Sequence, residues 1–255
     1  MTWLDLLLLL GAGAAAGLIN TVVGSGTLIT FPTLLALGVP PVTANVSNTI
    51  GLAPGSVSGA LATRSELGDQ RSRLLRLGSA SLIGSILGAV LLLRLPSAAF
   101  DAIVPALIGL GCVLVLLQPW LSRRMAVRRE RLGRGEHPPH GSVWLWFTVA
   151  LAGVYGGYFG AAQGVLLIAV LGIGLAEALP RINAIKNVLS AIVNGVAGVV
   201  FVLISHVNWS AAAAIAVGSV LGAQLGGPVG RRLPPLVYRV VIVAVGVAAI
   251  VNLLR

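Results

Sequence analysis

The sequence predicts an all-α polytopic membrane protein built from two inverted-topology repeats. Charged residues make up only 9% of the 255 residues, hydrophobic residues make up 57%, and the mean hydropathy is +0.99. A soluble domain carries about 25% charged residues, so this composition excludes a soluble enzyme. The 17 Lys and Arg residues occur in short runs between apolar stretches, as in membrane-flanking loops. This layout also excludes nucleic acid as a partner, despite the net charge of +10.

The apolar stretches predict the helices in order along the chain. A membrane-spanning helix needs about 20 predominantly apolar residues. Eight stretches meet this requirement, at about 3–22, 44–63, 74–94, 100–120, 142–160, 184–205, 209–229 and 236–254. Two shorter apolar segments, 25–40 and 162–178, are interrupted by glycines, and they either cross or fold back on the preceding helix. The first stretch follows Thr2 and Asp5, spaced as in a helix N-cap, and it lacks the basic start of a secretory signal, which favours a retained helix over a cleaved one.

The two halves of the chain resemble each other. Segment 17–24 aligns with 153–160 at an offset of 136 residues, which also relates Gly38 to Gly174. Further matches relate 44–59 to 184–199, and Gly84 and Gly88 to Gly222 and Gly226. We therefore predict a first membrane repeat over 1–120, a basic linker over 121–141 and a second membrane repeat over 142–255.

The charges predict that the repeats have opposite orientations. Loop 64–76 is rich in arginine whereas its counterpart 205–209 has none, and loop 94–100 has one arginine whereas 231–239 has three. Placing the arginine-rich loops in the cytoplasm puts 15 of the 17 cations there, as the positive-inside rule requires, with both termini outside a bacterial inner membrane. Inverted repeats are typical of secondary transporters, which bind substrate near the membrane midplane between the halves.

Polar residues within apolar stretches are candidates for a substrate site, because they are expensive to bury in a bilayer. Where glycines interrupt a helix, backbone N–H groups lose their intrahelical partners. Such unpaired N–H groups at the start of a helix favour binding of an anion. The predicted substrate-binding residues are Asn20, Gly24, Ser25, Gly26, Thr27, Asn45, Ser47, Asn48, Gly160, Gln163, Gly164, Lys186, Asn187 and Asn194. The alternative for these polar side chains is hydrogen bonding between helices. The glycine rows, such as Gly218 to Gly230, indicate close helix packing.

Lys186 is the single lysine of the chain and admits two interpretations. In the first it faces Asn45 and Ser47 across the repeat axis and provides the positive charge that an anion needs. In the second it lies at the membrane interface beside Arg181 and extends toward the cytoplasm. The sequence leaves both open.

The segment from Gly17 to Pro41, followed by Ala44, resembles the sulfite exporter TauE/SafE family. It has the Gly-x-Gly of that family, at Gly24 and Gly26, and the same proline-containing apolar run ending in Gly-hydrophobic-Pro-Pro. The segment 153–164 and the glycines at 222 and 226 resemble the second half of that family. The resemblance implies a permease for a small anion such as sulfite, an organosulfonate such as sulfoacetate, or a related carboxylate. The second-half motif departs from the family pattern at 160–164, and Lys186 and Asn187 stand where Ser or Thr is common, which leaves room for a substrate other than sulfite.

Other functions fit the sequence less well. A membrane-embedded enzyme needs an acid/base pair, a nucleophile or metal ligands at membrane depth, and the acidic residues all fall in predicted loops or boundaries. His137, His140 and His206 lack nearby ligands for a metal, so no metal and no cofactor are expected. An anion channel or a structural membrane protein is the alternative to a transporter. The expected partners are a small anion and the lipid bilayer, and the sequence does not decide between monomer and homodimer.

Overall fold

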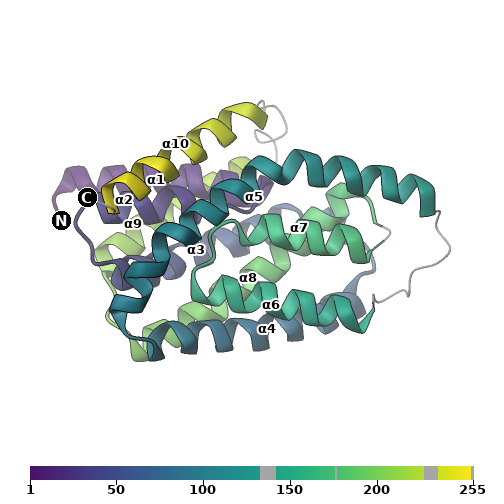
Figure 1. The fold of residues 1–255 in the computed structure, drawn as a ribbon, viewed down its shortest axis with the longest axis horizontal. Helices are drawn as coiled ribbons and strands as arrows, with labels where there is room; N and C mark the ends of the chain where they lie inside the picture. The colour runs from purple at the N-terminus through teal and green to yellow at the C-terminus, as the bar shows by residue number, and fades with distance from the viewer. Residues whose placement is uncertain (133–141, 176, 227–234, 254–255) are drawn as a thin grey trace.

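Ten α-helices and one short 3-10 helix form the described part of the computed structural model, residues 1–132, 142–175, 177–226 and 235–253, with no strand among them (Figure 1). The predicted all-α class is therefore confirmed. The helices are α1 Trp3–Val22, α2 Thr27–Ala36, α3 Pro41–Ala62, η1 Arg64–Glu66, α4 Arg71–Arg94, α5 Ser97–Leu132, α6 Val143–Tyr158, α7 Gln163–Gly174, α8 Leu179–Ile204, α9 Trp209–Gly226 and α10 Pro235–Leu253.

Five of these helices are long and apolar enough to cross a membrane: α1, α4, α5 up to Arg124, α8 and α9. Helix α3 has 22 residues, but buried Asn, Ser and Thr side chains lower its hydropathy. Helix α6 stops after 16 residues, because the chain turns at Gly160 with a φ of +76°, a conformation that favours glycine. Helices α2 and α7, with 10 and 12 residues, are the two short segments that the sequence predicts.

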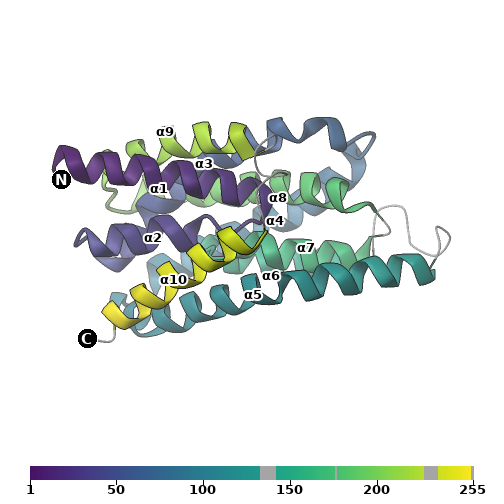
Figure 2. The same cartoon turned by 90° about the horizontal axis from the view of Figure 1, so that it is seen from above.

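The short helices fold back on the helices that precede them. Helix α1 runs inward from the end of the molecule where the chain starts, and α2 returns toward that end (Figure 2). Gly26, just before α2, accordingly packs against Ala16 of α1. Helix α6 enters from the opposite end, and α7 returns toward it, so that Gly174 at the end of α7 packs on Leu145 at the start of α6. Each half therefore contains one helical hairpin whose tip lies inside the molecule.

Glycine rows bring two helix pairs into backbone contact. Helix α1 packs against α9, and helix α6 packs against α4. A Cβ atom at Gly222 would lie 1.8 Å from Ala14 O, and a Cβ atom at Gly84 would lie 2.2 Å from Ala150 O. Both distances are far below van der Waals contact, so a larger residue cannot be accommodated without separating the helices. The predicted packing role is therefore confirmed for Gly84, Gly88, Gly218, Gly222 and Gly226, whereas Gly230 lies outside the described residues.

Replacing Gly17 by alanine is expected to lower the free energy of unfolding by about 1–3 kcal/mol, the usual cost of overpacking. The new methyl group would lie 2.1 Å from the backbone oxygen of Ser219 on α9. Gly11 on the same helix has nothing within 4 Å of its Cβ position, so Gly11→Ala is the matched control. Thermal unfolding in detergent measures both variants, and equal stability of the two would contradict this account of the α1–α9 contact.

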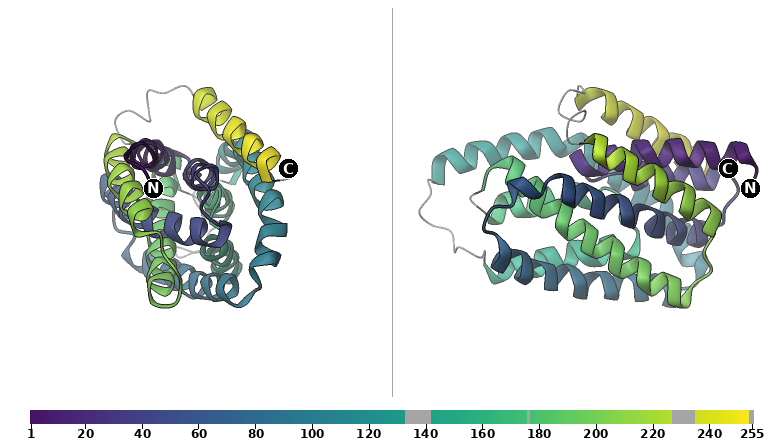
Figure 3. Two further views of the ribbon diagram at one scale, coloured as in Figure 1. Left: turned by 90° about the vertical axis from the view of Figure 1, so that its left-hand side faces the viewer. Right: turned by 180° about the vertical axis from the view of Figure 1, so that it is seen from behind.

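The helix ends partly follow the sequence prediction. Thr2 and Asp5 form a complete capping box at the start of α1, as predicted: Asp5 N–H donates to Thr2 Oγ1 at 3.3 Å and Thr2 N–H to Asp5 Oδ2 at 2.7 Å. Segment 121–132 continues helix α5, although the sequence suggested a loop there. The Arg, Leu, Met and Ala residues of this segment are good helix formers, and the first helix breaker after it is Gly133. Helix α1 begins and helix α10 ends at the same end of the molecule (Figure 3).

Candidate functional site

The tips of the two helical hairpins meet inside the protein. Gly164 N–H donates a hydrogen bond to Gly24 O at 3.0 Å, so the break in the first half contacts the break in the second. A Cβ atom on Gly24 would lie 2.3 Å from the Cα of Gly164. Gly24 also has a φ of +87°, a left-handed conformation. We call the region around this contact the crossing, and define it by residues 23–27 and 160–165.

Helix α8 hydrogen-bonds the last turn of α1 beside the crossing. Lys186 Nζ donates to Asn20 O at 2.9 Å and to Thr21 O at 3.3 Å. Asn183 and Asn187 each donate from Nδ2 to Thr21 O, at 3.1 and 3.3 Å. These carbonyls belong to the end of a helix, where they lack intrahelical partners and attract a positive charge. The lysine and two asparagines thus complete the hydrogen bonding of an interrupted helix.

Helix α3 makes the corresponding contact with the other hairpin. Asn45 Nδ2 donates to Tyr158 O, in the last turn of α6, at 2.9 Å. Asn48 lies one turn further along the same face of α3 and contacts α2: its Nδ2 donates to Thr27 Oγ1 at 3.3 Å, and its Oδ1 accepts a hydrogen bond from Thr30. Helix α3 therefore hydrogen-bonds the end of α6, and helix α8 hydrogen-bonds the end of α1, so the third helix of each half binds the first helix of the other half.

The buried polar atoms without a hydrogen-bond partner at or beside the crossing include Ser25 Oγ, Asn45 Oδ1, Gln163 Nε2 and Asn183 Oδ1. The residues Ser25, Asn45 and Gln163 are 0%, 0% and 3% exposed. Buried polar groups are normally hydrogen-bonded, and each unpaired group costs about 1–3 kcal/mol. Ser25 is adjacent to Gly24, and Gln163 is adjacent to Gly164, so both hairpins contribute an unpaired group near one point. A hydroxyl and an amide N–H both donate, which suits an oxyanion.

Some predicted site residues lie elsewhere. Ser47 Oγ accepts a hydrogen bond from Asn208 N–H at 2.9 Å, before α9. Lys186 does not face Ser47 as expected, because residues two apart on a helix point in different directions: Ser47 binds Asn208, whereas Asn45 binds Tyr158 beside the crossing. Asn194 Nδ2 donates to Ser56 Oγ at 2.8 Å, as hydrogen bonding between helices predicts.

Lys186 does not extend toward the cytoplasm beside Arg181, since it is 0% exposed. Its stem instead passes over the crossing: a Cβ atom on Gly164 would lie 3.0 Å from Lys186 Cδ. The lysine therefore touches both hairpin tips, the second through its stem and the first through its ammonium group.

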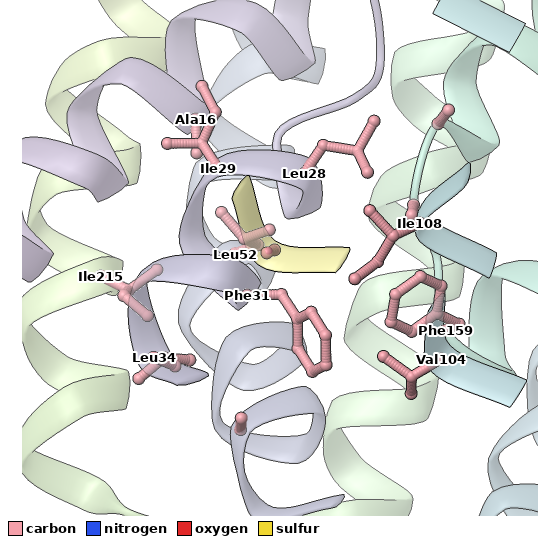
Figure 4. Close-up of a cluster of buried hydrophobic side chains, with 14 of the residues drawn as sticks. Ala16, Leu28, Ile29, Phe31, Leu34, Leu52, Val104, Ile108, Phe159 and Ile215 are labelled. Atoms are coloured by element: carbon pink, nitrogen blue, oxygen red, sulfur yellow. The ribbon is translucent and has the colours of Figure 1, made fainter. Parts of the chain in front are cut away.

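A cavity of about 400 Å³ lies beside α1 and α8, on the side of the molecule where α5 ends (Figure 2). The residues that line it include Thr21, Asn183, Glu66 and Ser122. Toward α2 and α5 the crossing adjoins a cluster of buried hydrophobic side chains. Figure 4 shows Phe31 of α2 beside Phe159, whose ring centroids are 5.1 Å apart, and Val104 and Ile108 of α5 around them. The crossing is therefore approached by a cavity from one end and covered by apolar side chains toward the other.

An ion-pair network joins the two halves at the cavity end. Glu177, between α7 and α8, accepts hydrogen bonds from Arg73 of α4 at 2.8 Å and from Arg181 of α8 at 3.0 Å. Gln70 Nε2 also donates to Glu177, at 3.2 Å. Burial acts to raise the pKa of the Glu177 carboxyl, but the hydrogen bonds from both arginines and Gln70 outweigh it and hold that pKa below its usual range.

Replacing Glu177 by glutamine is expected to lower the free energy of unfolding by about 1–3 kcal/mol at neutral pH, because charge-assisted hydrogen bonds are lost. Because the pKa of the Glu177 carboxyl is lower in the folded protein than in the unfolded chain, its ionised form stabilises the fold, and this stabilisation is complete above the unfolded-state pKa of 4.5. The stabilisation is lost as the pH falls from 4.5 through the folded-state pKa. Thermal unfolding of both proteins at neutral and acidic pH measures the effect. An undiminished difference in stability well below the folded-state pKa would contradict the assignment.

The sequence reasoning did not place Thr21, Thr30, Ser56, Thr63 or Tyr158 at the site. Thr21 and Tyr158 act through backbone carbonyls, which no side-chain pattern reveals. Thr63 accepts from Asn187 Nδ2 at 3.2 Å, and it lies at the end of α3 in a position that resembles a loop. Within the described residues, no group of three His, Cys, Asp or Glu side chains could hold a metal ion.

Comparison with known proteins gives one family and several relatives. The model of the sulfite exporter TauE/SafE family matches residues 9–253. The chain is 27% identical over 219 residues to the probable membrane transporter protein YfcA of Escherichia coli K12, covering 83% of this chain and 75% of the relative. It is 29% identical over 233 residues to a probable membrane transporter protein of Haemophilus influenzae, covering 88% and 84%. A probable membrane transporter protein of Sinorhizobium, ORF9, is 28% identical over 256 residues, covering 95% and 90%. No solved structure matches the chain.

Proposed function

The chain belongs to the sulfite exporter TauE/SafE family and is a multi-pass membrane transporter, and on that premise we propose that it carries a small anion by alternating access. The proposed substrates are sulfite, an organosulfonate such as sulfoacetate, or a related small carboxylate. The proposed location is a bacterial inner membrane, with the basic linker in the cytoplasm and both termini outside.

The meeting of the two hairpin tips is the observation that carries this proposal. Ser25 and Gln163 offer unpaired donors from the two hairpins, and Lys186 adds the positive charge. Helices α2 and α7 both start at the crossing, and the N–H groups in the first turn of a helix favour an anion. A sulfonate or carboxylate oxygen bound at the crossing would pair these groups. Secondary transporters place their substrates at such interrupted helices near the midplane.

An inverted repeat is the arrangement that we propose to underlie alternating access. In such a repeat, α1 to α5 are equivalent to α6 to α10 in the same order. The helix contacts support it, since the α1–α9 contact is equivalent to the α6–α4 contact and the α2–α10 contact is equivalent to the α7–α5 contact. The glycine contacts support it too: Gly222 meets Ala14 as Gly84 meets Ala150, and the two partners are 136 residues apart. The hairpins enter from opposite ends of the molecule (Figure 2). We propose five membrane segments per half, with 1–120 and 142–255 as the repeats and 121–141 as the linker.

The cavity and the aromatic cluster, defined here as Phe31 and Phe159, are consistent with one state of an alternating-access cycle. The cavity reaches Thr21 from the side where α5 ends, whereas Phe31 and Phe159 cover the crossing toward the other end. We propose that this is the state open to the cytoplasm. In the opposite state the cavity closes and the aromatic cluster separates, so that the anion leaves on the outer side.

A thermal-shift screen of the purified protein tests the substrate class. Sulfite, sulfate, sulfoacetate, taurine and short carboxylates are the probes, because a ligand that binds the folded state raises the unfolding temperature by mass action. We expect stabilisation by at least one small anion, and none by zwitterionic taurine at the same concentration. Stabilisation by none of the anions, in a protein that unfolds cooperatively, would contradict the proposed substrate class.

A further inference from the structure

The ammonium group of Lys186 has two hydrogen-bond acceptors, Asn20 O and Thr21 O. A protonated lysine has three N–H donors, whereas a neutral lysine has two donors and a lone pair. The two carbonyls therefore satisfy both donors of the neutral amine, but they leave one donor of the ammonium without an acceptor. An anion at the crossing would supply the third acceptor.

No negative side chain compensates Lys186 within the described part of the chain. Helices α3 and α7, which pack against α8, have no ionisable side chains. The ionisable groups on the other contacting elements are Asp5 of α1, Arg64 and Glu66 of η1, Arg71, Arg73, Arg76 and Arg94 of α4, and Tyr155 and Tyr158 of α6, with Arg181 on α8 itself. None of them hydrogen-bonds Lys186, and Glu177 pairs with Arg73 and Arg181.

Burying a charge without a counter-charge is costly, and the cost falls when an opposite charge arrives. The anion and the proton on Lys186 therefore stabilise each other: the anion is bound best by the ammonium, and the ammonium is stabilised best by the anion. The cavity comes close to Lys186, since its lining includes Thr21, whose carbonyl accepts a hydrogen bond from Lys186 Nζ, and Asn183, which lies one helical turn before Lys186 on α8.

We propose that Lys186 couples anion transport to proton movement, an inference that rests on the proposed function. The amine lone pair takes a proton from water in the cavity as the anion binds, and the resulting ammonium–anion pair crosses together. On the other side the anion leaves, and the N–H bond breaks as the proton returns to water. The empty protein goes back with a neutral lysine that keeps its two carbonyl partners. One proton thus moves with each anion in the same direction, and transport of a monovalent anion is electroneutral.

Proteoliposomes with a pH-sensitive dye inside test the coupling. The probes are methanesulfonate and sulfoacetate, which stay fully ionised between about pH 6 and about pH 9, so they carry no proton themselves. When liposomes loaded with the probe are diluted into probe-free buffer, we expect the lumen to become alkaline as protons leave with the anion. Anion efflux from wild-type liposomes without any change in luminal pH would overturn the inference and leave the proposed function standing. Absence of efflux of both probes would instead contradict the organosulfonates among the proposed substrates, and the inference with them.

The pH dependence of binding provides a second measurement. Because anion binding and protonation favour each other, the affinity for methanesulfonate is expected to fall as the pH rises, by up to about tenfold per pH unit. Lys186→Arg retains a charge that is never lost, so its affinity is expected to be independent of pH. If the larger arginine cannot be accommodated beside Gly164 and Lys186→Arg does not fold, the wild-type protein alone tests the coupling. A wild-type affinity for methanesulfonate that does not change between pH 6 and pH 9 would overturn it.

Discussion

Replacing Lys186 by glutamine is expected to reduce the rate of anion transport about 30- to 4,000-fold, because removing one partner of a buried charge pair costs about 2–5 kcal/mol and 1.4 kcal/mol corresponds to a factor of ten. Glutamine keeps an N–H donor for the carbonyls at the end of α1 but removes the positive charge at the crossing. We therefore expect the variant to fold and to reach the membrane. Uptake of a labelled organosulfonate into proteoliposomes, at matched protein density, measures the effect.

Arg181→Gln is the matched control for Lys186→Gln. It removes a positive charge from the same helix, but at a side chain that is 43% exposed and that bonds Glu177 rather than the crossing. Because exposed ion pairs contribute little, we expect this variant to transport within about twofold of the wild type. Unchanged transport by Lys186→Gln, or an equal loss in both variants, would remove Lys186 from the substrate site.

Replacing Gly164 by alanine is expected to lower the transport rate about 10- to 100-fold while most of the fold is retained. The added methyl group would lie 2.4 Å from Gly24 Cα and 3.0 Å from Lys186 Cδ. Overpacking of this kind costs about 1–3 kcal/mol and is relieved by separating the two hairpin tips. Since 1.4 kcal/mol corresponds to a factor of ten, an overpacking cost of about 1–3 kcal/mol accounts for the expected loss of transport rate. Transport and thermal unfolding are measured on the same preparation.

Gly195→Ala is the control for Gly164→Ala. Gly195 lies on α8, and nothing is within 4 Å of its Cβ position. Alanine is the better helix former by about 1 kcal/mol, so this variant is expected to be at least as stable as the wild type and equally active. Normal transport by Gly164→Ala would show that the contact between the hairpins does not contribute to the site.

The sequence predicts the helical elements and the two breaks well, because glycine spacing and apolar length are local properties. The short helices α2 and α7 follow from Gly24 and Gly160, and the glycine rows follow from their four-residue spacing. The contact between Gly24 and Gly164 joins residues 140 positions apart, and no periodicity along the chain reveals it.

The side chains of the site are predicted less well than the breaks. Asn45 and Ser47 belong to one polar cluster in the sequence, but helix geometry turns only Asn45 toward the crossing. The carbonyls of Asn20 and Thr21 that bind Lys186 belong to the backbone, so residue identity does not mark them. His137, His140 and Arg134 lie outside the described residues, and their predicted place in the basic linker stays a prediction.

Counterflow of a labelled anion tests the central claim most directly, because only a carrier that alternates between two sides exchanges substrate against its gradient. Proteoliposomes are loaded with unlabelled sulfoacetate, and labelled sulfoacetate is added outside at a lower concentration. We predict that label accumulates transiently above its equilibrium level, and that Lys186→Gln abolishes the accumulation. Equilibration of the label without any overshoot, at the same rate in loaded and empty liposomes, would contradict alternating access and indicate a channel.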